Sequence, residues 1–110
     1  MAKDDYHVII YEILSYLYKV LKEGRSIDKD KLSYEYLNIN KKYWIYIFES
    51  MKEDGLVKGY KLVNTKDGLL FLGLEKTVIT PTGIDYLFEN STIQKVKNAL
   101  KDIKDVIPFI

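Results

Sequence analysis

A single residue, Ile39, separates the predicted end of one helix from the predicted start of the next. Asn38 is suited to end the first of these helices, and Asn40 is suited to cap the second, because short polar side chains satisfy backbone groups that helix ends leave unpaired. So short a connection forces the two helix axes to cross at a large angle. The spacing therefore predicts a helix-turn-helix arrangement.

Apolar residues repeat at three- and four-residue steps on both sides of this connection. Over Asp5–Glu23 they predict a long first helix with one buried stripe, which Gly24 ends. Asp28 is predicted to cap a short second helix that contains Leu32, Tyr36 and Leu37. The third helix is predicted over residues 41–54, and its buried face is expected to consist of Trp44, Ile47, Phe48 and Met51.

Branched and aromatic residues over Leu56–Val63 and Leu69–Thr80 predict two strands. The strongest turn signal between them is Asp67-Gly68, which is typical of a hairpin. Gly73 is predicted to mark a bulge in the second strand. These features predict a two-stranded hairpin, which is marginally stable alone and is therefore expected to pack on the helices.

Thr80-Pro81 predicts the start of a fourth helix, because threonine caps and proline is well tolerated at the first helical position. Its buried residues are expected to be Ile84, Leu87 and Phe88. The capping-box pattern that begins at Ser91 predicts a fifth helix, assigned to residues 91–108, which ends before or at Pro108.

The predicted order is three helices, a two-stranded hairpin and two C-terminal helices. This order is typical of an α+β fold of the winged-helix type, in which the hairpin is the wing. The chain has 110 residues, 47% of them hydrophobic, which is enough for one core. A single winged-helix-like domain is therefore expected over residues 1–110.

Two stretches also carry a family resemblance. Gly55–Gly59 and Val78–Leu87 resemble the end of many winged-helix domains, where a strand closing on an aliphatic residue and threonine leads into a helix with an early glycine. Residues 89–91 and Lys101–Phe109 narrow the match, and the chain resembles the YjcQ-like family of small proteins of Gram-positive bacteria and their phages. The similarity spans nearly the whole chain, most clearly residues 55–108. It implies a winged-helix-like fold and phage-associated biology, and it supplies no catalytic or ligand residues.

Residue types needed for catalysis or metal binding are sparse. Cysteine is absent, His7 is the single histidine, and no glycine-rich phosphate loop occurs. His7 is interpreted as an ordinary surface or boundary residue, and the carboxylates, interleaved with lysines, as a solvated surface. We therefore expect no catalytic residues, no metal site and no cofactor, and we expect the protein not to be an enzyme.

Duplex DNA is the partner that the fold prediction favours. The formal net charge is only +1, a weak electrostatic basis for nucleic-acid binding, but residues 41–66 contain six lysines against three acidic residues. The third helix is the candidate recognition helix, and the wing is expected to reach the phosphate backbone. The candidate DNA contacts are Asn40, Lys41, Lys42, Tyr43, Tyr46, Lys58, Lys61 and Lys66.

A protein-interaction module, either an adaptor or an inhibitor with no DNA-binding role, is the alternative. Glu49 and Glu53 are predicted to point outward from the third helix, where they would repel phosphate. The ten tyrosines are also open to two interpretations, as residues that complete the edge of a small core or as a contact surface. The regulator of phage or prophage type and the interaction module thus remain two hypotheses.

The fifth helix has an apolar seam with the spacing of two heptads. One interpretation is that this helix caps the domain by packing on the first helix, and the other is that it forms a homodimer. The candidate dimer-interface residues are Ile93, Val96, Leu100, Ile103 and Ile107.

The chain is also expected to be cytoplasmic. Asp4 and Asp5 stand where a signal peptide would need positive charge. The apolar runs are far shorter than the roughly 20 residues that cross a bilayer, so no membrane association is expected.

Overall fold

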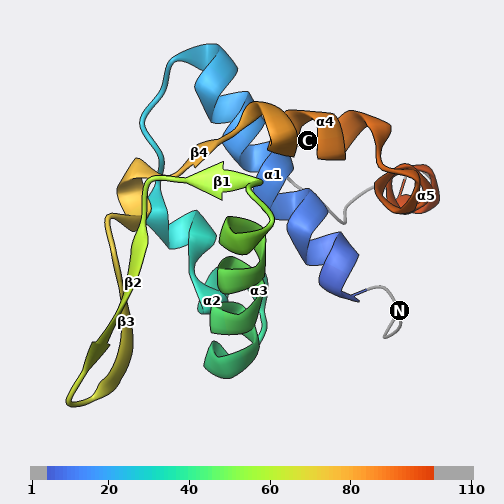
Figure 1. Ribbon diagram of the computed structural model, residues 1–110. Coiled ribbons are helices and arrows are strands. Elements are labelled where there is room, and N and C mark those ends of the chain that lie inside the picture. The colour runs from blue at the N-terminus through green and yellow to red at the C-terminus, as the bar shows by residue number, and fades with distance from the viewer. Residues whose placement is uncertain (1–4, 101–110) are drawn as a thin grey trace.

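The computed structural model of the chain, shown in Figure 1, describes residues 5–100. Helix α1 (Asp5–Glu23) has the predicted bounds and crosses the middle of the molecule. It contacts α3, α4, α5 and strand β4, so several faces of the helix are buried at once. Ile10, Ile13 and Leu14 are each at most 1% exposed. The predicted apolar stripe of the first helix is therefore the centre of the core.

The predicted second helix is in fact two short pieces. A 3-10 turn, η2 (Lys29–Leu32), is capped by Asp28 as predicted, but a single α-helical turn, α2 (Tyr34–Leu37), follows it separately. Between them Ser33 has an extended backbone, and its hydroxyl oxygen accepts a hydrogen bond from the Tyr36 amide at 3.1 Å. The prediction of one continuous helix was wrong because this side chain satisfies the backbone and restarts the helix.

The one-residue connection to the third helix is confirmed. Asn38 adopts the left-handed conformation, with φ of 59°, and ends α2. The Asn40 side chain then accepts a hydrogen bond from the Tyr43 amide at 2.8 Å and caps α3 (Lys41–Glu53). The local chemistry of two asparagines thus fixes where one helix stops and the next starts.

The predicted inward face of α3 is also confirmed, because Trp44, Ile47, Phe48 and Met51 are all buried. The Trp44 indole donates a hydrogen bond to the Leu32 carbonyl at 2.7 Å. Its ring also packs edge-on against Phe71 of the hairpin, with 4.7 Å between centroids. Trp44 therefore joins α3 to both η2 and the hairpin.

The predicted hairpin is present, but as two separate two-stranded sheets. At its base, β1 (Val57–Lys58) pairs antiparallel with β4 (Val78–Ile79). Farther out, β2 (Lys61–Thr65) pairs antiparallel with β3 (Gly68–Leu72) and forms the projecting ribbon of Figure 1. The two predicted continuous strands were therefore wrong in length, although their antiparallel pairing and the turn at residues 66–67 were right.

The interruption lies at two glycines on opposite sides of the ribbon. Gly59 has φ of +112°, and a Cβ there would lie 2.2 Å from the Lys76 carbonyl oxygen. Gly73 has φ of +78° and precedes a 3-10 turn, η3 (Leu74–Lys76). The predicted bulge at Gly73 was thus wrong, because the returning strand stops there and makes a helical turn instead.

Helix α4 (Pro81–Glu89) begins as predicted, with the Thr80 hydroxyl accepting a hydrogen bond from the Gly83 amide at 3.0 Å. Leu87 is buried and Ile84 is partly buried against the core, but Phe88 is 45% exposed, so its predicted burial was wrong. Phe88 follows Leu87 directly and therefore turns away from the side that packs on α1.

Helix α5 is described over Ser91–Leu100, and the rest of the predicted fifth helix lies outside the described residues. Its cap is Asn90, whose side chain accepts hydrogen bonds from the Thr92 and Ile93 amides, and not Ser91 as predicted. The Gln94 side chain instead donates to the carbonyls at the end of α4. The described residues together form an α+β fold of helices α1 to α5 and two small sheets, and none of these helices is long and apolar enough to cross a membrane.

Candidate nucleic-acid interface

The N-terminal half of α3 presents a polar outer face. Asn40, Lys41 and Lys42 are exposed, and Tyr46 is 58% exposed. Tyr43 is half-buried and packs against the core, so it is less accessible than its neighbours. Unpaired amides give a helix N-terminus a partial positive charge, which adds to that of the two ammonium groups. This end of α3 is therefore suited to an anionic partner.

The hairpin brings one further candidate lysine, Lys66, toward the same end of the molecule. In Figure 1 the turn between β2 and β3 and the N-terminus of α3 both point downward. Lys66 lies in that turn and is exposed. Lys61 is also exposed, but it is the first residue of β2 and lies at the opposite end of that strand from the turn. Lys58 is exposed too, but it belongs to β1 at the base of the ribbon, near the other end of α3. The structure thus places Lys66 at the same end as the α3 lysines and separates Lys58 and Lys61 from them.

A groove of about 320 Å³ lies between the ribbon, η2 and the start of α3. Trp44 and Phe71 form part of its apolar wall. Lys29 and Tyr34, which the sequence did not single out, also line it, because η2 and α2 fold against the same end of α3. No local pattern marks these two residues, since only the tertiary fold brings them to the groove. The described lining residues are Lys29, Tyr34, Lys41, Trp44, Leu69, Leu70, Phe71, Leu74 and Glu75.

Two features of this region oppose phosphate binding. Glu49 and Glu53 are exposed on the C-terminal half of α3, as predicted. On the ribbon, Leu70 and Leu72 are 51% and 49% exposed. Cross-strand pairing sets Val63 opposite Leu70, so on the face of the ribbon that does not carry Phe71 an apolar patch of Val63, Leu70 and Leu72 lies between Lys61 and Thr65. The interface is therefore cationic at one end and apolar on the outer ribbon face.

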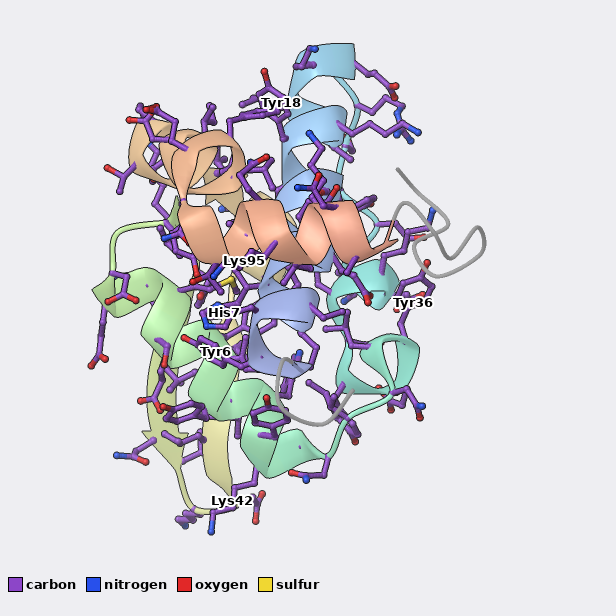
Figure 2. All side chains as sticks on the ribbon, turned by 90° about the vertical axis from the view of Figure 1, so that its right-hand side faces the viewer. Tyr6, His7, Tyr18, Tyr36, Lys42 and Lys95 are labelled. Carbon is purple, nitrogen blue, oxygen red and sulfur yellow. The ribbon has the colours of Figure 1, made fainter. Side chains whose placement is uncertain are left out.

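A separate polar cluster lies where α1, α3 and α4 meet. The His7 Nδ1 is 3.2 Å from the Tyr86 hydroxyl, and the Tyr6 ring packs edge-on against His7 and near Tyr46. Figure 2 shows Tyr6 and His7 side by side. Burial raises the pKa of Tyr6 and of Tyr86 above the ordinary tyrosine value. Among residues 5–100 no group of three metal-ligating side chains is assembled, here or elsewhere.

A comparison with models of known protein families finds a match that covers most of the chain. The family model described as "YjcQ protein" matches residues 11–106. The chain belongs to the YjcQ family. The resemblance found in the sequence is thereby confirmed over almost its full extent. No curated protein and no solved structure matches this YjcQ family member.

The tyrosines of this YjcQ protein mostly complete its core. Tyr11, Tyr16 and Tyr60 are buried, and five others pack partly buried against the core. Tyr36 and Tyr46 are the exposed ones, at 42% and 58%. The edge-of-core interpretation therefore holds for all but two of the ten tyrosines.

The α5 seam of the YjcQ protein is partly used within the chain. Ile93 and Val96 are 0% and 6% exposed, because α5 packs on α1 and α4. The Leu100 side chain, Ile103 and Ile107 lie outside the described residues. At its first two positions the seam thus has the intrachain packing that the capping interpretation requires.

Proposed function

We propose that this YjcQ family member is a winged-helix DNA-binding regulator of phage or prophage type. In this proposal α3 is the recognition helix, and the ribbon β2–β3 is the wing. Helix α3 enters the major groove of the DNA, and Lys41 and Lys42 contact the phosphates beside it. Lys66 contacts the DNA backbone from the wing.

The observation that carries the proposal is the common position of the α3 N-terminus and the ribbon turn at one end of the molecule (Figure 1). Lysines far apart in the sequence are exposed there together, although the whole chain has a net charge of only +1. A nearly neutral protein can bind a polyanion when its positive charge is concentrated on one surface. Tyr46, beside these lysines, is available to reach base edges, whereas the Asn40 side-chain oxygen is engaged in capping α3.

Salt dependence of binding tests this function. Binding of the intact chain to a mixed-sequence DNA duplex is measured by fluorescence anisotropy at several salt concentrations. Each phosphate contact contributes about 0.9 to the slope of log affinity against log salt. The double variant Lys41→Glu, Lys42→Glu is therefore expected to bind at least tenfold more weakly and to lose about 2 from that slope.

A matched variant controls for net charge. Lys19→Glu with Lys95→Glu changes the charge equally, but on α1 and α5, where both side chains are exposed. This variant is expected to retain most of the binding. Equal loss in both variants, or no binding by the unmodified chain at low salt, would contradict the DNA-binding proposal.

The second candidate is a protein-interaction module, and the apolar outer face of the ribbon favours it. Leu70 and Leu72 are half-exposed, and apolar side chains do not contribute to phosphate contacts. In this alternative the adaptor or inhibitor binds its target through Val63, Leu70 and Leu72, flanked by Lys61.

Paired variants separate the two candidates. Leu70→Ser with Leu72→Ser is expected to abolish retention of a specific host protein in co-purification if the module proposal holds, while Lys41→Glu with Lys42→Glu leaves it intact. The DNA-binding proposal expects the opposite pattern for DNA. Retention that neither variant changes would count against the ribbon face as the binding surface.

A further inference from the structure

We propose that a cavity between α1, α4 and α5 is a binding site for a small organic anion with a flat aromatic body. The cavity measures about 340 Å³, within the range of small-molecule sites. It is separate from the proposed DNA surface, and the inference does not depend on that function. Its described lining residues are Tyr11, Ser15, Tyr18, Lys19, Lys22, Glu23, Leu87, Phe88 and Lys97.

The apolar walls of the cavity are formed by three aromatic residues and Leu87. Tyr11 and Leu87 are buried, at 5% and 4% exposure. Tyr18 and Phe88 meet edge to face, with 5.4 Å between ring centroids. Phe88 is 45% exposed, although it lies on a helix that packs against the core. A flat ring placed in the cavity would cover Phe88 and gain the edge and face contacts that aromatic groups prefer.

Two ammonium groups lie against these same rings. The Lys22 Nζ is 5.2 Å from the centroid of Tyr18, and the Lys97 Nζ is 5.5 Å from the centroid of Phe88. Lys19 also lines the cavity. The cation–π contacts hold the two charges beside the apolar walls. A ligand that joins an aromatic body to a carboxylate, sulfonate or phosphate would match both features of the cavity.

The charge balance of the cavity favours an anion. Glu23 is the one carboxylate among the described lining residues, against three lysines. Its Oε1 accepts a hydrogen bond from the Arg25 Nε at 2.6 Å. Because Arg25 already neutralises Glu23, the lysines are left as the dominant charge at the cavity, and a cationic ligand would be repelled.

The cavity lies away from the α3 lysines. Figure 2 shows Tyr18 at the top of the molecule and Lys42 at the bottom. Binding at either place therefore leaves the other accessible, and the two proposals can be tested on the same protein without interference.

Titration with 1-naphthalenesulfonate tests the proposal, with binding followed through the amide signals of the intact protein by NMR. We expect saturable shifts for residues of the cavity, above all Tyr18, Phe88 and Lys97. Removing two surface charges from a partly exposed site costs about tenfold in affinity, so Lys22→Gln with Lys97→Gln should bind the probe about tenfold more weakly. The neutral 1-naphthalenemethanol should bind equally to both proteins.

The wing supplies a matched control, because Lys61→Gln with Lys66→Gln removes the same charge and should leave the affinity unchanged. Phe88→Ala should weaken both probes, since it removes one aromatic wall from an exposed position. The proposal is overturned by the absence of saturable shifts at the cavity, by equal affinity in the Lys22/Lys97 variant, or by equal affinity for the sulfonate and the alcohol. The dispersion of the amide signals verifies that each variant is folded.

Discussion

At the scale of single residues, Glu12 shows what burial does to an ionisable group. It lies half-buried on α1, next to Tyr11 and Ile13, which are in the core. Burial raises the pKa of its carboxyl to about 7. The described residues form no ion pair with it. Below about pH 7 the protonated form is therefore favoured in the folded chain, since removing the proton leaves a charge with little water around it.

This pKa has a direct effect on stability. An unfolded chain releases the Glu12 proton near pH 4.5, and the folded chain retains it until about pH 7. The folded state binds more protons in this window, so the stability contributed by the neutral carboxyl is complete below pH 4.5 and is lost as the pH rises through 7. Glu12→Gln should then raise the free energy of unfolding at pH 8 by about 1–2 kcal/mol. The gain is no larger because water reaches the partly exposed carboxyl and stabilises its charge.

Urea unfolding followed by circular dichroism at pH 4 and pH 8 checks this expectation. The variant should gain stability over the unmodified protein at pH 8 and little or none at pH 4. Glu89→Gln is the control, because Glu89 is exposed at the end of α4 and should change stability equally little at both pH values. An equal effect of Glu12→Gln at both pH values would show that the carboxyl is not protonated in the fold.

At the scale of the elements, the position of α4 depends on close packing at Gly83. The helix passes so near the base of the hairpin that a Cβ on Gly83 would lie 2.2 Å from the Leu56 carbonyl oxygen and 2.7 Å from the Ile79 Cγ1. The Thr80 hydroxyl, which caps α4, also donates a hydrogen bond to the Gly55 carbonyl. The start of α4 is thus fixed against the end of α3 and the first strand.

Gly83→Ala is expected to destabilise the protein by about 2 kcal/mol. Alanine is better than glycine in a helix by about 1 kcal/mol, but the overlap with the Leu56 backbone cannot be relieved by moving one side chain, and overpacking of this kind costs about 1–3 kcal/mol or more. Thermal unfolding measures the difference. Thr82→Ala, one position earlier and exposed, should change stability by less than about 0.5 kcal/mol. A stabilised Gly83→Ala variant would mean that α4 does not approach β1 so closely.

The elements also show which parts of the fold could be predicted from the sequence. The bounds of α1 and α3 follow from apolar spacing and from caps such as Asn40, which act within a few residues. The break in the hairpin cannot be predicted from such local signals. Glycine is required at position 59 because the Lys76 backbone, seventeen positions later in the chain, lies against it. The α3 lysines were predictable from helix geometry in the same way. Lys29 and the cavity between α1, α4 and α5 were not, since tertiary packing alone brings their residues together.

At the scale of the whole molecule, α5 completes the core. Ile93 is fully buried and Val96 nearly so, between α1 and α4. A homodimer through the seam would therefore rely on Leu100, Ile103 and Ile107, whose side chains lie outside the described residues. The earlier part serves folding of the single chain.

Ile93→Glu distinguishes these roles. A charge at a fully buried position costs several kcal/mol, so this variant should be largely unfolded at 25 °C. Lys95→Glu, an exposed neighbour on the same helix, should remain folded. Circular dichroism and sedimentation velocity together give the result. A folded monomer from Ile93→Glu, combined with a dimer of the unmodified protein, would instead assign Ile93 to the interface between two chains.

The two glycines that interrupt the hairpin have a mechanical consequence. Gly59 and Gly73 face each other across the ribbon, so the hydrogen-bond ladder of β2–β3 does not continue into β1–β4. The ribbon therefore has no continuous ladder to its base, and the ring of Phe71, packed against Trp44, Phe48 and Tyr60, is an aromatic contact that joins it to the rest of the molecule. Because Phe71 packs on Trp44 and Phe48 of α3, a smaller side chain at position 71 is expected to loosen the position of the Lys66 turn relative to Lys41 and Lys42 without altering any lysine.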